Sequence, residues 1–108
     1  MSDISLGQFK EAELRVAKVL DVLEVEGADR LWKLRIDVGG EKKEIVAGIK
    51  QSYSREALLG KNIVVVNNLA PAVIRGVESR GMLLAAREGD SLTLIVTDRE
   101  VSSGSSVG

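Results

Sequence analysis

The sequence has no cysteine and no histidine, and it has only one proline and three aromatic residues among 108 positions. Without cysteine and histidine there is no disulfide framework, no thiol or Ser-His-Asp nucleophile, no imidazole proton shuttle and no Cys/His metal site. The carboxylates show no Mg²⁺- or Ca²⁺-binding spacing. We therefore expect no enzymatic activity, no metal, no cofactor and no small-molecule substrate.

Long apolar runs are also missing. No segment approaches the roughly 18–20 consecutive apolar residues that a membrane-spanning helix needs, and the N-terminus has no basic region followed by an apolar one. These absences predict a cytoplasmic protein without a membrane partner. At 108 residues and 44% hydrophobic content, residues 1–108 are expected to form a single domain.

The net charge of −1 conceals an uneven distribution. Residues 1–29 carry a net charge of −4, residues 30–87 carry +6 and residues 88–108 carry −3. A basic central block can present a face that attracts a polyanion with salt-sensitive affinity. The alternative is a mixed, solvated surface, which charge counting alone favours.

Short runs with a period of two dominate the middle of the chain, as expected for half-buried strands. Leu34, Ile36 and Val38 alternate with Lys33, Arg35 and Asp37, and a Gly39-Gly40 turn follows. A short helix is expected over 52–60, where Ser54 can cap it and Gly60 can end it. Strands are predicted at 15–25, 31–39, 42–49 and 61–69, the first possibly bulged, with a hairpin over 81–98.

Three segments carry weaker signals. Residues 70–81 hold the only proline and two glycines and are predicted to form a long loop. Residues 4–14 are expected to be a short helix or an irregular arm, and the Ser/Gly-rich tail 101–108 is expected to be a flexible segment or a turn.

Five or more antiparallel strands with one short helix between the third and fourth indicate an all-β, five-stranded OB-fold barrel. An SH3-like barrel or a small sandwich has similar strand spacing.

Residues 9–108 resemble the tRNA-binding OB-fold domain that is appended to many methionyl-tRNA synthetases and also occurs as a stand-alone protein. The opening strands match it at Arg15, Val16, Lys18, Ala28, Asp29, Leu31, Leu34, Asp37 and Gly39. The middle matches at Ile45, Val46, Gly48, Ile49, Tyr53, Glu56, Leu58, Gly60, Lys61, Asn68, Leu69 and Pro71. The most specific segment is 75–86, with Gly76, Ser79, Gly81 and Met82 in place.

The resemblance implies an OB-fold with a C-terminal strand extension, usually a homodimer, that binds tRNA by shape and backbone without catalysis. Departures from the family pattern include Ala17 in place of a common glycine and Gly27 in place of a His-Pro-like turn. Ala70 and Ala72 stand where relatives often carry basic residues, which removes charge from the loop expected to meet RNA. Ser102-Ser103 replaces a frequent proline near the dimer interface.

Candidate RNA-binding residues follow from this resemblance and from the strand alternation. Lys33 and Arg35 share the outward face of their strand, and Lys43 could join them if the register allows. Arg75 and Arg80 bracket the long loop and are candidates for phosphate contacts. The complete candidate set is Lys33, Arg35, Lys43, Asn68, Arg75, Ser79, Arg80 and Met82.

A structural role is the alternative for several of these residues. Asn68 and Ser79 can line a nucleotide pocket, or Asn68 can tie down the long loop while Gly81 allows close backbone approach. Met82 is expected to fill the core. Trp32 and Tyr53 are expected to pack rather than to stack on bases, which argues against a dedicated single-strand binder.

The favoured hypothesis is a non-catalytic tRNA-binding module, dimeric, that acts alone or with methionyl-tRNA synthetase. Two alternatives remain: a chaperone-like module that binds protein segments, and a dimerisation domain of a synthetase. RNA binding predicts strong salt dependence, whereas binding of an apolar peptide predicts little. An initial Met and an early domain start favour a complete short chain, although an excised domain has the same appearance.

Overall fold

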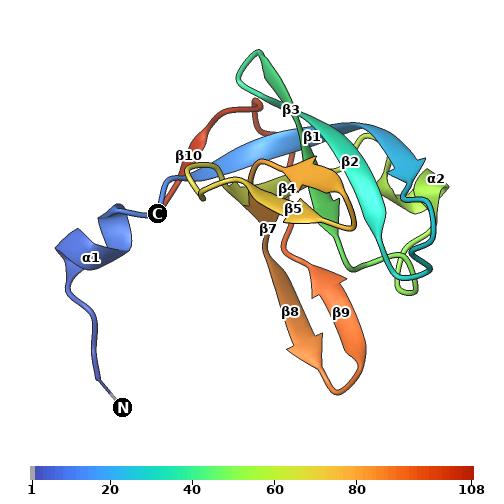
Figure 1. The fold of residues 1–108 in the computed structure, drawn as a ribbon. Helices are drawn as coiled ribbons and strands as arrows, with labels where there is room; N and C mark the ends of the chain where they lie inside the picture. The colour runs from blue at the N-terminus through green and yellow to red at the C-terminus, as the bar shows by residue number, and fades with distance from the viewer. Residues whose placement is uncertain (1) are drawn as a thin grey trace.

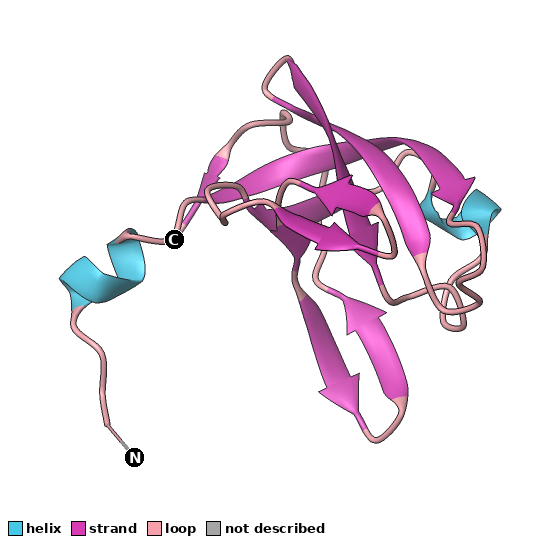
Figure 2. Cartoon of the chain, in the orientation of Figure 1, coloured by secondary structure: helices cyan, strands magenta, loops and turns pink. Residues whose placement is uncertain are grey.

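The computed structural model describes residues 2–108, which form an all-β domain with two short helices (Figures 1 and 2). Helix α1 spans Leu6–Lys10 and helix α2 spans Arg55–Leu58. The strands are β1 (Leu14–Glu24), β2 (Trp32–Val38), β3 (Glu41–Ala47), β4 (Asn62–Val66), β5 (Ala72–Ile74), β6 (Val77–Ser79), β7 (Met82–Leu83), β8 (Ala85–Glu88), β9 (Ser91–Leu94) and β10 (Ser106–Val107). No helix in residues 2–108 has the length and apolar character needed to cross a membrane.

The main sheet has the order β3-β2-β1-β4-β7, with β10 also paired to β1, and it curls on itself (Figure 1). Strand β1 is 11 residues long, and its register against β2 shifts between Val19 and Asp21. The irregularity lets one strand pair with β4 in its first half and with β2 in its second. The architecture confirms the predicted OB-fold, including the bulge in the first strand and the C-terminal strand extension.

The barrel closes where residues 79–81 meet β3. The main-chain N–H of Val46 donates to Ser79 Oγ at 2.9 Å, and Ser79 Oγ donates to the carbonyl of Gly81 at 3.1 Å. The N–H of Arg80 donates to the carbonyl of Glu44 at 2.9 Å. A buried serine hydroxyl thus takes the place of a ladder hydrogen bond and satisfies polar groups of two chain segments.

Gly81 lets this segment approach the sheet closely. Its φ is +144°, and a Cβ placed there would lie 3.1 Å from the carbonyl oxygen of Val66 and 3.4 Å from Ile45 Cγ2. A side chain would therefore crowd the backbone of β4 in a conformation that L-residues rarely adopt. The prediction that Gly81 allows close backbone approach is confirmed.

The core follows the alternation in the sequence. Leu34 and Ile36 of β2 are fully buried, and Leu58 of α2 fills the same cluster. Strand β4 is buried along almost its whole length, as its continuous apolar run predicts. The predicted helix is confirmed, with Ser54 accepting from the N–H of Ala57 at 3.2 Å.

Residues 70–81 are not a long loop, and this prediction is wrong. They form the β5–β6 hairpin, whose turn residues Arg75 and Gly76 have φ of +52° and +78°. The hairpin packs on the outer side of β3, because Ile74 and Val77 contact a second small cluster that contains Val46. Its strands are only three residues long, and the adjacent apolar residues Val73 and Ile74 show no period-two pattern that would distinguish this hairpin from a loop.

The tail is a fixed turn rather than a flexible segment. Gly104 donates its N–H to the carbonyl of Val16 at 2.6 Å, and Ser105 accepts from the N–H of Val16 at 2.9 Å. Ser103 Oγ donates to Asp37 Oδ2 at 2.9 Å. These bonds, followed by the pairing of β10 with β1, hold the C-terminus against the barrel.

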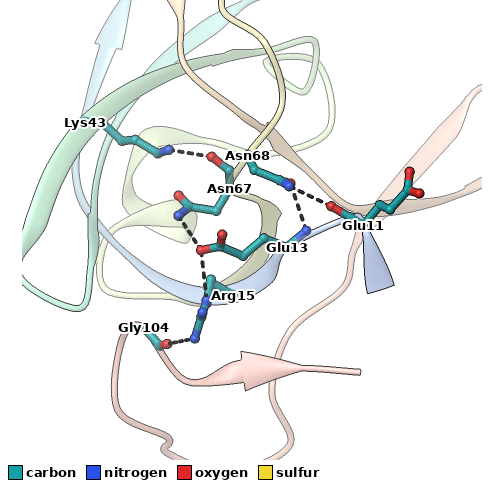
Figure 3. A network of polar contacts seen from close by, with 7 residues as sticks. All are labelled: Glu11, Glu13, Arg15, Lys43, Asn67, Asn68 and Gly104. Carbon is teal, nitrogen blue, oxygen red and sulfur yellow. Dashed lines mark hydrogen bonds and ion pairs between the residues drawn. The ribbon is translucent and has the colours of Figure 1, made fainter. Parts of the chain in front are cut away.

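A polar network fastens the entry into β1 to the end of β4 (Figure 3). Asn68 Oδ1 accepts from the N–H of Glu13 at 2.8 Å, and Asn68 Nδ2 donates to the carbonyl of Glu11 at 2.7 Å. Glu13 Oε1 accepts from Asn67 Nδ2 and from Arg15 Nε, both at 3.2 Å. Each amide therefore bridges segments more than 50 positions apart in the chain.

The same network reaches β3 and the tail. Lys43 Nζ donates to the carbonyl of Asn67 at 2.9 Å, and Arg15 Nη1 donates to the carbonyl of Gly104 at 3.2 Å (Figure 3). The hydrogen bond from Asn67, and secondly the bond from Arg15, lower the pKa of Glu13 below its ordinary value of 4.5. The ionised form of Glu13 is therefore part of the folded arrangement.

Replacing Ser79 with alanine tests the closure. The Ser79→Ala variant leaves the N–H of Val46 buried without its partner, so we expect a loss of roughly 1–3 kcal/mol in the free energy of unfolding. The melting temperature should fall by roughly 4–8 °C for each kcal/mol. Thermal and urea unfolding measure both quantities. Ser91→Ala, at an exposed position in β9, is the control; equal losses in the two variants would refute a special role for Ser79.

Acid stability tests the network around Glu13. Because the folded-state pKa is below the ordinary value of 4.5, the stabilisation is complete above pH 4.5 and is lost as the pH falls through the folded-state pKa. The Glu13→Gln variant should be less stable than the wild type at neutral pH, and the difference should shrink in acid. Urea unfolding at a series of pH values measures it. A difference that is the same at every pH would contradict this origin.

Candidate nucleic-acid interface

Two cations and one carboxylate lie together on the outer face of β2 and β3. Arg35 pairs with Glu44 in the ladder, and Lys33 pairs with Val46. Glu44 Oε2 lies 3.5 Å from Arg35 Nη2, and Glu44 Oε1 lies 3.8 Å from Lys33 Nζ. The predicted placement of Lys33 and Arg35 on one face is confirmed, and a shared carboxylate accompanies them.

The β5–β6 hairpin brings further cations to this face. A hollow of about 440 Å³ lies between β3 and β6, and Arg80 reaches it from the end of the hairpin. Its lining comprises Arg35, Lys42, Lys43, Glu44, Val77, Glu78 and Arg80. The ammonium group of Lys43 is turned away to the carbonyl of Asn67, which leaves three cationic and two acidic side chains on this face. The hollow therefore carries an excess of positive charge.

A second hollow lies at the turn of the same hairpin. It measures about 370 Å³ and is lined by residues 27–31 together with Ile74 and Arg75. Arg30 and Arg75 contribute positive charge there, and Asp29 contributes one negative charge. Cations thus flank both ends of the hairpin. We call the following set the hairpin surface: Arg30, Lys33, Arg35, Lys42, Arg75 and Arg80.

Lys43 does not join Lys33 and Arg35, and this prediction is wrong. The register places Lys43 opposite Ile36, on the inner face of β3, where the residue is only 9% exposed. Its ammonium group donates to the carbonyl of Asn67. Because side chains alternate along a strand, the neighbour of Glu44 must point the other way.

Asn68 and Ser79 have hydrogen-bond partners within the chain. Ser79 is buried at the barrel closure, and the Asn68 amide holds the segment Glu11–Glu13. This arrangement matches the structural alternative for both residues, with the difference that Asn68 ties the N-terminal segment rather than residues 70–81. The two side chains do not line a common pocket in the part of the chain that the structure describes.

Met82 is exposed, so its expected place in the core is wrong. Strand β7 pairs Met82 with Val66 at the edge of the sheet, and its side chain lines an apolar groove of about 490 Å³. The groove runs between the β5–β6 hairpin and the β8–β9 hairpin, and Leu69, Ile74 and Leu92 contribute to it. Met82 is therefore separate from the two hollows of the hairpin surface.

Trp32 and Tyr53 pack, as predicted. Trp32 is 8% exposed, its Nε1 donates to the carbonyl of Tyr53 at 2.9 Å, and Lys50 Nζ lies 4.8 Å from its ring centroid. The hydroxyl of Tyr53 accepts from the N–H of Leu94 at 2.9 Å. Phe9 lies on α1, beside a hollow that it lines together with Leu14 of β1 and Val107 of β10. Neither hollow of the hairpin surface has an aromatic residue in its described lining.

Several other cations are held by carboxylates at short range. Lys50 lies 3.1 Å from Glu24, and Arg55 lies 2.9 Å from Asp21. The hydrogen bond from the N–H of Val22, followed by the one from Arg55, lowers the pKa of Asp21. These pairs are closer than those of Glu44 with Lys33 and Arg35.

A similar pair involves Glu100 beside β4. Lys18 lies 3.1 Å from Glu100, and the pKa of Glu100 is lowered, chiefly by a hydrogen bond from Asn62 and then by the bond from Lys18. Residues 2–108 contain no group of three or more carboxylates that could together hold a metal ion.

Comparison with known proteins places these features in a family. Residues 14–106 match the family described as "Putative tRNA binding domain". The chain is 49% identical over 104 residues to methionine–tRNA ligase of Thermotoga maritima and 42% identical over 107 residues to that of Pyrococcus furiosus. These matches cover 96% and 99% of this chain, but only 16% and 15% of the length of the two relatives.

Two solved structures have the same fold throughout. A MetRS-related protein from Pyrococcus horikoshii superposes with a TM-score of 0.94 at 34% identity and covers 100% of both chains. The chaperone CsaA from Bacillus anthracis superposes with a TM-score of 0.90 at 26% identity, covering 99% of this chain and 100% of that one. From its fold and from the match over residues 14–106, we conclude that the chain belongs to the putative tRNA-binding domain family.

Proposed function

We propose that the chain is a non-catalytic module that binds tRNA through the hairpin surface. The observation that carries the proposal is the gathering of cations from β2, β3 and both ends of the β5–β6 hairpin around two hollows. Phosphate groups of a folded RNA are the ligands that such a surface fits, since lysine and arginine bind phosphate through charge-assisted hydrogen bonds. Four of the residues proposed from sequence belong to it: Lys33, Arg35, Arg75 and Arg80.

The surface favours recognition of RNA backbone and shape. Proteins that bind single strands usually stack bases on exposed aromatic rings, whereas Trp32 and Tyr53 are engaged within this domain. Double-helical RNA offers phosphates and 2′-hydroxyls across a shallow minor groove, which side chains on a curved β-surface can follow. We therefore infer little discrimination between tRNA species by base contacts.

The relatives suggest the setting in which this binding is used. Both relatives reported above are methionine–tRNA ligases, and this chain corresponds to a small part of each. We infer that the module supports aminoacylation in the cytoplasm by raising the local concentration of tRNA, alone or with a methionyl-tRNA synthetase. In this proposal the synthetase carries out the catalytic step, and the module only binds tRNA.

An apolar groove favours a second candidate function, the binding of an extended apolar peptide. The groove of about 490 Å³ between the two hairpins has Arg87 as the one charged residue in its described lining. CsaA, which shares the fold, carries the name of a chaperone. Peptide binding in this groove should be insensitive to salt and to changes in Arg35 or Arg80, which distinguishes it from tRNA binding.

We also infer a homodimer formed through the N-terminal arm. Helix α1 stands clear of the barrel (Figure 1), and Ile4, Leu6 and Phe9 are all exposed. A five-residue helix is not stable alone in water, even with the capping box that Ser5 and Gln8 form. A second copy can cover the arm and the adjoining surface at β10 in a two-fold, self-complementary contact.

Binding of bulk tRNA at several salt concentrations tests the main proposal. Log Kd should vary linearly with log salt concentration for the wild type. The double variant Arg35→Ala/Arg80→Ala should bind all tRNAs more weakly and reduce the salt slope by about two. The double variant Arg87→Ala/Arg99→Ala removes the same charge outside both hollows and is the matched control. Unchanged binding by the double variant, or no binding by the wild type at low salt, would refute the proposal.

A change of the apolar side of α1 tests whether the chain dimerises through the N-terminal arm. Replacing both Leu6 and Phe9 with aspartate places charge on the apolar side of α1, so we expect a shift to monomer in sedimentation velocity. Val73→Asp adds a negative charge at an exposed apolar position on β5, and this control variant should remain dimeric. A monomeric wild type, or equal dissociation of both variants, would disprove assembly through the arm.

A further inference from the structure

The carboxylate of Glu44 lies among cations of the hairpin surface. It is shared by Lys33 at 3.8 Å and Arg35 at 3.5 Å, and it lines the 440 Å³ hollow together with Lys42 and Arg80. Its side chain is 35% exposed, so it is neither buried in the core nor free in solvent. Its main-chain carbonyl independently accepts from Arg80 at the barrel closure.

The two ion pairs of Glu44 are loose. Charge-assisted N–H···O bonds have optimal lengths of about 2.7–2.9 Å, and the pair of Arg55 with Asp21 reaches 2.9 Å in the same domain. One carboxylate also has to serve two cations, whereas a guanidinium alone has five donors. The cations of the hollow therefore have unused capacity to bind an anion.

The geometry points to a phosphate subsite at the wall of the hollow between β3 and β6, where Glu44 pairs with Arg35 and Lys33 as an internal anion in the free protein; we propose that a backbone phosphate of RNA takes its place. This inference rests on the proposed function and identifies where one phosphate binds. Two oxygens of a phosphate can accept from an arginine fork as a carboxylate does, and a lysine attracts either anion as a point charge. Glu44 then limits affinity, because every bound phosphate must first compete with it.

Glu78 supplies a matched control. It lines the same hollow and carries the same charge, but it makes no ion pair within 4.0 Å in the part of the chain that the structure describes. Glu44→Gln and Glu78→Gln therefore change the net charge equally, and only the first releases Lys33 and Arg35. Glutamine at position 44 keeps the size of the side chain and leaves the main-chain bond to Arg80 in place.

The first experiment measures binding of bulk tRNA to the full chain and to both variants at several salt concentrations. Glu44→Gln should bind about threefold to tenfold more tightly than the wild type at low salt, with a salt slope steeper by up to about two. Glu78→Gln should change the slope little. Equal gains in both variants would show a general charge effect and overturn the subsite. Weaker binding by Glu44→Gln would show that Glu44 orients the cations instead.

A second experiment separates this inference from the proposed function. The melting temperature is compared in inorganic phosphate and in sodium chloride of equal ionic strength. A larger phosphate-dependent rise is expected for Glu44→Gln than for the wild type and Glu78→Gln. Phosphate stabilises all three chains by exclusion from their surface, and it stabilises Glu44→Gln further by binding where no carboxylate competes. If this larger rise occurs but no variant binds tRNA, the proposed function fails and the subsite stands. If the wild type binds tRNA and Glu44→Gln gains neither affinity nor this further thermal stabilisation, the subsite fails alone.

Discussion

The contact of residues 79–81 with β3 is the constraint on which the rest of this domain depends. The hydroxyl of Ser79 completes the edge of β3, and Gly81 brings the chain against β4 without a side chain in the way. The hairpin that carries Arg75 and Arg80 ends at this contact, so barrel closure and the position of those cations are determined together. A residue with a short, buried polar side chain thus sets the geometry of an exposed charged surface.

Strand faces could be predicted from the sequence, because the alternation of apolar and polar residues continues over several consecutive positions. The alternation of Leu34 and Ile36 with Lys33 and Arg35 fixes both the buried and the exposed face of β2, and Ser54 and Gly60 mark the helix ends. Strand β4, the 81–98 hairpin and the OB-fold order follow from the same kind of evidence. The common face of Lys33 and Arg35 is a direct consequence of that period.

Features that depend on pairing between distant residues could not be predicted. The register of β3 decides that Glu44, and not Lys43, faces Arg35, and one residue of slippage would reverse them. The β5–β6 hairpin has strands of only three residues, and Ile74 and Val77 hold it by packing on Val46, about 30 positions away. A count of charges likewise does not show which carboxylate lies beside which cation. In the structure, the basic central block contains both close ion pairs and loosely held cations.

The turn of the β5–β6 hairpin contains Arg75 in a backbone conformation that arginine rarely adopts. Arg75 has a positive φ of +52°, a backbone conformation that favours glycine or asparagine and costs a residue such as arginine about 1 kcal/mol. Asparagine or glycine there would relax the backbone and at the same time remove a cation from the rim of the second hollow. The stability of the fold therefore favours glycine or asparagine at position 75, whereas affinity for an anion at the second hollow favours arginine. Under the proposed function, an arginine at position 75 therefore exchanges some backbone stability for a cation beside the hollow.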